Sequence, residues 1–351
     1  MKNARPTPPE NRKDAHLRIC LEEAVERNGV TTGFERYHFE HDALPEVDRA
    51  QIDLRTTIFG KELQAPILIG AMTGGTPRAQ RLNHILATAA QECGVAMALG
   101  SQRPMLEQPA AAETYDVREQ APDLFLIGNI GAVQLNYGVT KDDLLRLIET
   151  TRCNAFAFHL NPLQEAIQPE GDTNFAGLIE KLNQIIPTLP VPVILKEVGA
   201  GFGEKTLRKI AHLPFAGLET AGAGGTSWAR IETYRTDSWI QQMTGTRLAG
   251  WGIPTARSLQ AAVRVLGSRE DRTIICYGGI RTGLEMAKAL AMGAHLVASA
   301  LPFLKAASEG GVEAVVLTIR QFMDELRTVC FVTGSKNVAE LQAQTLLEGT
   351  L

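Results

Sequence analysis

Eight short apolar runs recur along the chain from residue 66 onward, and no other feature constrains the fold as strongly. Each run is almost uninterrupted by polar residues, which is typical of parallel strands that are buried on both faces. A strand with one face in water would instead alternate polar and apolar residues. We therefore expect parallel strands at residues 66–71, 95–100, 124–130, 155–160, 193–198, 215–220, 273–277 and 295–300.

Stretches with helical spacing of apolar residues lie between these runs, at 81–93, 141–150, 175–186, 258–266 and 283–292. Eight strands that are each followed by a helix favour a closed (β/α)8 TIM barrel, an α/β fold. An open, doubly wound sheet is the alternative. It is disfavoured because the GxGxxG loop that such sheets usually carry after their first strand is absent.

No repeat or linker divides the chain, so residues 1–351 are expected to form one domain. Residues 1–65 would form an N-terminal extension that covers the barrel and contains a helix at 14–28. Residues 311–351 would form C-terminal helices, with a long helix at 311–333.

The composition excludes several classes of protein. Hydrophobic residues make up 44% of the chain, enough for a large core, and the net charge of −4 offers no general attraction to nucleic acid or to an anionic membrane. No apolar run approaches the roughly 20 residues that span a bilayer, and the N-terminus lacks the apolar core of a signal peptide, so we expect a cytoplasmic protein. The five cysteines form no CxxC pair and are interpreted as reduced thiols.

Polar residues at the carboxyl ends of the strands indicate a binding site, because these ends meet at one rim of a barrel. Gly278 and Gly279 follow the seventh run and would let backbone N–H groups approach an oxyanion without an intervening Cβ. The helix that begins near Thr282 would add its N-terminal dipole, and Ala300 and Leu301 would supply opposing N–H groups. Paired glycines often mark only a tight turn, but this position favours a phosphate site.

Lys196 lies inside an apolar run, so its ammonium needs an anionic or electron-rich partner, such as the N1 edge of a reduced flavin. Polar side chains at other strand ends would bond the rest of a flat polar ring. With the phosphate site, this fits FMN better than a bare sugar phosphate. The expected cofactor contacts are Ala71, Met72, Thr73, Ser101, Asn129, Lys196, Thr226, Gly278, Gly279, Ile280, Arg281, Ala300 and Leu301.

A second anion site is indicated near the N-terminus, where Arg12 and His16 would lie one turn apart on a helix with Lys13 beside them. A solvated basic helix end is the alternative interpretation. Ser101 and Arg103 would add donors at the rim. Arginine forks and lysine charges together are what a diphosphate requires.

Glu165 is the best single candidate for a metal ligand. Mg²⁺ keeps much of its hydration, so one carboxylate with substrate oxygens and waters makes an ordinary site. The alternative is a surface acid without a ligand. His38 and His41 have no further ligand nearby and are interpreted as structural.

Seven short segments carry a more specific signal. In chain order they are Arg12-Lys13-x-x-His16, Met72-Thr73-Gly74-Gly75, Gly100-Ser101-Gln102-Arg103, His159-Leu160-Asn161-x-x-Gln164-Glu165, Lys196-Glu197-Val198-Gly199, Gly224-Gly225-Thr226 and Gly278-Gly279. From the N-terminal helix to Leu341 the chain closely resembles the type 2 isopentenyl-diphosphate isomerases. HLNxxQE together with KEVG is the specific part of this resemblance, whereas Gly-Gly alone is not.

The resemblance implies an enzyme that uses FMN, Mg²⁺ and NADPH to interconvert isopentenyl and dimethylallyl diphosphate in isoprenoid biosynthesis, as a homotetramer or homo-octamer. It implies that Glu165 binds Mg²⁺. Two positions depart from the family, which usually has Asp where this chain has Glu219 and often has Ser where it has Ala221. The residues implied to bind substrate are Arg12, Lys13, His16, Ser101, Gln102, Arg103, His159, Asn161 and Gln164.

The implied reaction moves a double bond, so one carbon gains a proton and another loses one. Gln164, the implied catalytic residue, is a neutral amide that cannot supply a proton, and Glu165 would be occupied by metal. We therefore expect reduced FMN to act as acid and base beside Gln164. Trp228 could stabilise a transient cation.

Two other functions are alternatives. An FMN-dependent 2-hydroxy-acid oxidase or dehydrogenase would need a histidine base just after the sixth strand, and residues 221–228, AGAGGTSW, contain none. A non-catalytic phosphate- or flavin-binding barrel would bind the same ligands without turning them over.

Overall fold

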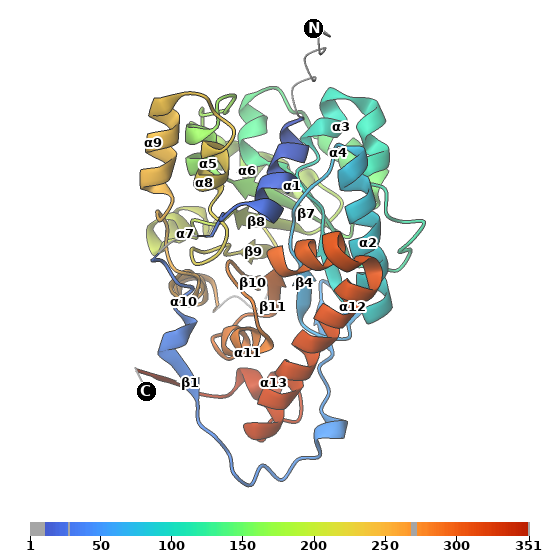
Figure 1. Ribbon diagram of the computed structural model, residues 1–351, viewed down its shortest axis with the longest axis vertical. Coiled ribbons are helices and arrows are strands. Elements are labelled where there is room, and N and C mark those ends of the chain that lie inside the picture. Colours follow the sequence, from blue (N-terminus) through green and yellow to red (C-terminus); the bar gives the residue numbers. More distant parts are fainter. Residues whose placement is uncertain (1–10, 27–28, 268–271, 350–351) are drawn as a thin grey trace, which may run out of the picture.

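Eight parallel strands close into a barrel at the centre of the molecule (Figure 1). The structure, a computed structural model, describes residues 11–26, 29–267 and 272–349. Pairing of Val297 in the last strand with Ile67 in the first closes the ring, so the (β/α)8 prediction is confirmed and the open sheet is wrong. The barrel strands are β4 (Ile67–Ile69), β5 (Ala96–Ala98), β6 (Leu126–Gly131), β7 (Ala155–Leu160), β8 (Val193–Glu197), β9 (Gly217–Glu219), β10 (Thr273–Tyr277) and β11 (Leu296–Ser299).

The helices expected between the strands are present with slightly shifted ends: α2 (Pro77–Cys93), α4 (Lys141–Thr151), α6 (Leu178–Ile185), α10 (Thr255–Leu266) and α11 (Gly283–Ala291). The sequence does not predict the shorter helices of the connecting segments, because few turns show little apolar periodicity. These are α3 (Arg103–Glu107), α5 (Pro162–Ile167), α7 (Glu204–Ile210), α8 (Trp228–Thr233) and α9 (Trp239–Leu248). Among the described residues, no helix is both long and apolar enough to cross a membrane.

Two predicted helix boundaries are wrong. The N-terminal helix α1 spans Arg12–Glu22 rather than 14–28, because Asn11 caps the N–H of Lys13 and the chain turns extended at Glu23; residue 28 lies outside the described residues. The last long helix α12 spans Leu301–Val332 and so begins directly after β11. Gly310 and Gly311 interrupt it with non-helical backbone, which is why only its second half shows a clear sequence pattern.

Elements outside the barrel cover its two ends. α1 lies across the barrel mouth (Figure 1), where the Ser227 N–H donates to the carbonyl of Val25 and the Thr76 hydroxyl donates to Asp14. The hairpin of β2 (Thr56–Ile58) and β3 (Lys61–Leu63) covers the opposite end. The remaining elements are α13 (Val338–Gln342), the pair β1 (Tyr37–Phe39) with β12 (Leu346–Glu348), and 3-10 turns at Phe34–Arg36, Arg49–Gln51, Pro109–Thr114, Ala132–Asn136 and Ile186–Thr188.

The barrel interior is filled in layers, because side chains two residues apart on a strand point to the same side. The lower layers are apolar and join Ile58 and Leu63 of the hairpin in one cluster, which includes Leu68, Ala96, Ala98, Ile127, Ala155, Ala157, Ile194, Ile275, Leu296 and Ala298. Two residues beyond these positions, the uppermost inward layer becomes polar. It is formed by Asn129, His159, Lys196, Glu219 and Tyr277.

The loops that follow β9 and β10 touch backbone to backbone beside this layer. Gly278 has a φ of +119°, and a Cβ built on it would lie 2.2 Å from the carbonyl oxygen of Gly222. The paired glycines are thus required by loop packing as well as by any ligand.

Gly278→Ala is expected to lower the thermal unfolding midpoint. A side chain at this φ costs about 1–3 kcal/mol, and the clash with Gly222 adds to it. Gly349→Ala is the control, because Gly349 has open space where a Cβ would be added. Circular dichroism melts that show the same midpoint for both variants would contradict this account of the loop contact.

Candidate functional site

Two adjoining cavities occupy the barrel mouth. The first is called here the glycine cavity because Gly278 and Gly279 line it, and the second is called the basic cavity because Arg12, Lys13 and Arg103 line it. The two share part of their walls, so they form one continuous space. The shared residues are Lys13, His16, Ala71, Met72, Val198, Trp228 and Tyr277.

The structure brings nearly all the predicted cofactor-contacting residues to these cavities. Ser101, Asn129 and Lys196 line the basic cavity. Ile280 lines neither cavity and is fully buried. The others line the glycine cavity: Ala71, Met72, Thr73, Thr226, Gly278, Gly279, Arg281, Ala300 and Leu301.

Backbone N–H groups are available at one end of the glycine cavity. No acceptor among the described residues takes the N–H of Gly279 or of Leu301, the first residue of α12. By contrast, Glu285 accepts from the N–H of Arg281, and a carboxylate from α12 accepts from that of Gly283. The start of α12, rather than the expected start of α11, is therefore the helix end that is free for an anion.

The floor of the site is the polar top layer of the barrel. Lys196 Nζ lies 3.0 Å from Glu219 Oε1 and 5.5 Å from the centre of the Tyr277 ring. The predicted anionic partner of Lys196 is thus supplied by the chain itself. Asn129 Oδ1 and His159 Nδ1 lie 2.9 Å apart, and burial next to the Lys196 charge lowers the pKa of His159 to about 3.

Three residues in the walls of the cavities each have a buried polar atom without a hydrogen-bond partner in the described chain. The Thr73 hydroxyl, in the wall of the glycine cavity, is buried and has no hydrogen-bond partner among the described residues. The same holds for Asn161 Oδ1 and Gln168 Nε2 in the basic cavity. Because a buried polar atom without a partner is costly, these positions indicate a polar ligand.

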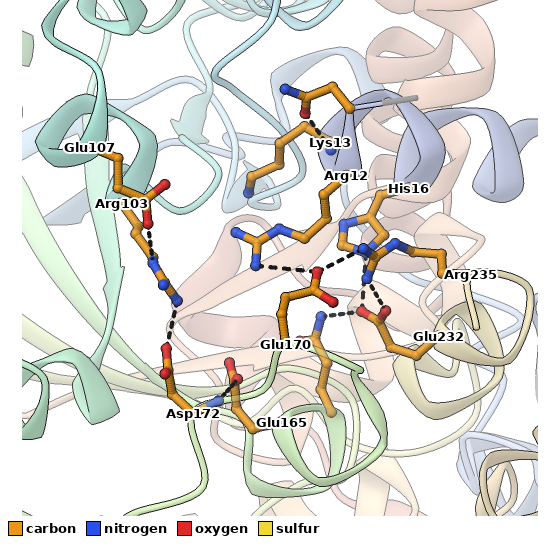
Figure 2. A network of polar contacts seen from close by, with 12 residues as sticks. Arg12, Lys13, His16, Arg103, Glu107, Glu165, Glu170, Asp172, Glu232 and Arg235 are labelled. Carbon is orange, nitrogen blue, oxygen red and sulfur yellow. Dashed lines mark hydrogen bonds and ion pairs between the residues drawn. The ribbon is translucent and has the colours of Figure 1, made fainter. Parts of the chain in front are cut away.

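Cations converge on the basic cavity from both sides (Figure 2). Arg12 and Lys13 extend from α1, and Arg103 extends from the start of α3. Arg12 lies 3.8 Å from Glu170, while Arg103 pairs with Asp172 at 2.6 Å. Burial, together with the neighbouring Arg12, lowers the pKa of Lys13 to about 7. An anion in this cavity would relieve the repulsion among the cations.

Glu165 lies below these cations and is held by two donors. Asn161 Nδ2 donates to its Oε1 and the N–H of Asp172 donates to its Oε2, both at 2.7 Å, while burial raises the pKa of the carboxyl. In the described chain no three His, Cys, Asp or Glu side chains are grouped for a metal ion. A cation bound here would therefore depend on Glu165 together with ligand oxygens and water.

Glu232, on α8, is the main residue that sequence reasoning missed. It is 0% exposed, and it accepts hydrogen bonds from His16 and Gln164 at 3.0 Å each and from Arg235. Burial alone would raise the pKa of Glu232, but His16 and Arg235 lower it to about 2. The carboxylate therefore anchors α1 to the rim through His16 (Figure 2). Its hydrogen bond from Gln164 also orients that amide. One acid in a short helix gives no sequence signal for this role.

Three other positions complete the comparison with the sequence. Gln102 is 0% exposed; its Oε1 accepts from the N–H of Asn129, and its Nε2 donates to the carbonyl of Leu147, so the structure does not bring this side chain into the cavity. The rings of Trp228 and His16 pack edge to face, with their centres 5.1 Å apart. Ala221 lines the glycine cavity at a φ of 38°.

The sequence matches a known family over most of its length. The model of the FMN-dependent dehydrogenase family matches residues 16–125 and 173–348. Among similar curated proteins, the isopentenyl-diphosphate delta-isomerase of a Nostoc species is 45% identical over 95% of this chain and 94% of its own length. The same-named proteins of a Synechococcus species and of Pyrococcus abyssi are 47% and 43% identical, over 96% of this chain and over 95% and 91% of their own lengths.

Solved structures share the fold at low sequence identity. A putative lactate oxidase of Pediococcus acidilactici has a TM-score of 0.69 at 17% identity, covering 93% of this chain and 88% of its own. A flavocytochrome b2 variant has a TM-score of 0.69 at 18% identity, covering 96% and 83%. At these identities the likeness shows the barrel architecture alone.

Glu232 generates a prediction about stability and pH. Its folded pKa, about 2, lies below the ordinary value of 4.5, so its stabilising contribution is complete above pH 4.5 and is lost as the pH falls towards 2. Glu232→Gln should therefore lower the free energy of unfolding by about 3 kcal/mol at pH 7, and the deficit should shrink between pH 4.5 and pH 3.

Urea unfolding of both proteins at several pH values measures this deficit. Glu92→Gln, which removes an exposed surface pair with Arg320, is the control and should change little. A deficit for Glu232→Gln that is as large at pH 3 as at pH 7 would show that the carboxylate charge is not the cause.

Proposed function

The chain belongs to the FMN-dependent dehydrogenase family and to the isopentenyl-diphosphate delta-isomerases, and we propose that it holds FMN in the glycine cavity with the substrate diphosphate in the basic cavity. The protein is an isomerase that uses FMN. The observation that carries the proposed arrangement is the meeting of two unlike anion sites in one space. One is built from backbone N–H groups and the other from arginine and lysine side chains.

The residues present in the glycine cavity fit FMN. The free N–H groups of Gly279 and Leu301 would hold its phosphate. The unpartnered hydroxyl of Thr73 would bond a polar edge of the ring. Lys196 lines the adjoining basic cavity and would lie beneath the part of the ring that reaches Tyr277 in the shared wall. When bound and reduced, FMN supplies the group that gives and takes the proton. We propose NADPH as the source of electrons that keep it reduced.

Arg12, Lys13 and Arg103 would hold the diphosphate in the basic cavity, because all three of these cationic side chains line it. Burial and the neighbouring Arg12 lower the pKa of Lys13 to about 7; this pKa would rise beside a diphosphate, and the side chain would bind as a cation. His16, Ser101, His159 and Asn161 are proposed to complete this pocket. Gln102 would support it from behind through Asn129 rather than by direct contact.

Glu165 would hold Mg²⁺ against the diphosphate. Its two existing donors, Asn161 and the backbone of Asp172, orient the carboxylate without neutralising it. A metal here would favour the ionised form of a carboxyl whose pKa is raised by burial. One protein carboxylate with diphosphate oxygens and water suits magnesium.

Gln164 would position the hydrocarbon end of the substrate. Its amide nitrogen donates to Glu232 and its carbonyl accepts from Asn161, so its orientation is fixed on both sides. Glu232 is ionised and fully engaged at neutral pH, so it would not supply a proton. Trp228, in the wall of both cavities, would face a developing positive charge.

The stretch 221–228 after β9 lacks a histidine base, so 2-hydroxy-acid oxidation on the same barrel has no base at the position where it would be needed.

We propose that the isomerase works in the cytoplasm as a homotetramer or homo-octamer, with no nucleic-acid or membrane partner.

Glu165→Gln should abolish the Mg²⁺-dependent activity while FMN binding stays unchanged, because the amide keeps the shape but loses the charge that holds the metal. We expect a fall in kcat of at least roughly 100-fold, from loss of metal stabilisation of the diphosphate. Glu180→Gln, on the exposed face of α6, is the control. Joint loss of FMN and activity in Glu165→Gln would mean that Glu165 supports the fold of the site instead.

The activity itself is tested by reducing the purified protein with NADPH and adding isopentenyl diphosphate, with and without Mg²⁺. Dimethylallyl diphosphate should form only with reduced flavin and metal present. A yellow protein that binds the diphosphate and never converts it would favour a binding barrel without catalysis.

A further inference from the structure

The floor of the site contains a buried acid that the proposed chemistry does not use. Glu219 ends β9 and is directly opposite Lys196 of β8 in the strand register. The side chains of Lys196 and Glu219 are only 4% and 1% exposed, and Nζ and Oε1 lie 3.0 Å apart. Since each strand places these residues two positions beyond an inward residue of the barrel, both point towards the barrel axis. Lys196 lines the basic cavity, and Glu219 lies next to it, buried below the cavity wall.

Lys196 is the sole ion-pair partner of Glu219 within the described chain. Despite the 3.0 Å separation, the contact lacks hydrogen-bond geometry, and neither carboxylate oxygen accepts a hydrogen bond from any described residue. Lys196 donates instead to the carbonyl of Glu197 at 2.9 Å. Buried charges are tolerated when they are paired, so the floor carries one cation and one anion with no net charge.

We propose that Glu219 is a positioning residue that offsets the charge of Lys196 and thereby sets how strongly the protein prefers reduced over oxidised FMN. The inference rests on the proposed function, in which the flavin ring lies over Lys196. Reduced flavin carries more negative charge at its N1 edge than oxidised flavin, so an ammonium beneath it favours the reduced form. A carboxylate 3.0 Å from that ammonium weakens this preference.

The test is the midpoint potential of the FMN-loaded protein relative to free FMN, which gives the ratio of the Kd values for oxidised and reduced FMN. Glu219→Gln should raise the preference for reduced FMN at least about tenfold, and Lys196→Gln should lower it at least about tenfold. At an effective dielectric constant of about 20, removing a unit charge within about 12 Å of the negative charge on reduced FMN changes the ratio of the two Kd values by about tenfold or more. Tenfold corresponds to about 30 mV for a two-electron couple.

The double variant Lys196→Gln/Glu219→Gln separates charge compensation from a structural role. The double variant restores a floor without net charge. Its preference for reduced over oxidised FMN should therefore lie within about threefold of that of the unsubstituted protein. A double variant that matches Lys196→Gln alone, with Glu219→Gln unchanged from the unsubstituted protein, overturns the inference and leaves the FMN placement standing. If no substitution moves the potential, the ring does not lie over Lys196 and the placement itself is wrong.

Glu219→Asp provides a second test if Glu219→Gln does not fold. The shorter side chain keeps the charge but draws it away from Lys196, so the preference for reduced FMN should rise by a factor between about two and ten. An unchanged or lower preference overturns the inference.

Discussion

Closure of the eight strands into one ring fixes the height at which each inward side chain sits, and the site depends on this constraint. Inward positions alternate along each strand, so neighbouring strands contribute residues to common layers. The lower layers are filled by small and branched apolar side chains, whereas the top layer is polar. Five strands therefore deliver Asn129, His159, Lys196, Glu219 and Tyr277 to one level without any loop having to position them.

The barrel alone does not complete the site, because two of the site's cations, Arg12 and Lys13, come from α1, which precedes the first barrel strand in the sequence. Glu232 joins the two parts: it accepts from His16 of α1 and from Gln164 of the rim. Any displacement of α1 would leave this buried carboxylate without one of its donors, which is costly. Placement of Arg12 and Lys13 and orientation of Gln164 are therefore linked through one residue.

The barrel and the location of the site follow from the sequence because both depend on local patterns: apolar runs fix the strands, and strand ends fix the rim. Side-chain direction is not local. Gln102 lies in a specific rim motif, yet it points into the wall and braces Asn129. Glu232 and Asp172 could not be predicted, because their roles arise only when segments distant in sequence meet. Glu219, where the family usually has Asp, can be interpreted only from its contact with Lys196, which the sequence does not show.

We propose that one continuous space at the barrel mouth holds FMN against backbone N–H groups and the substrate diphosphate against side-chain cations. A crystal structure of the protein with FMN, Mg²⁺ and inorganic pyrophosphate tests it directly. We expect the FMN phosphate at the N–H groups of Gly279 and Leu301 and the pyrophosphate among Arg12, Lys13 and Arg103, with the metal at Glu165. FMN phosphate bound by those three cations, or a flavin ring away from Lys196, would contradict it.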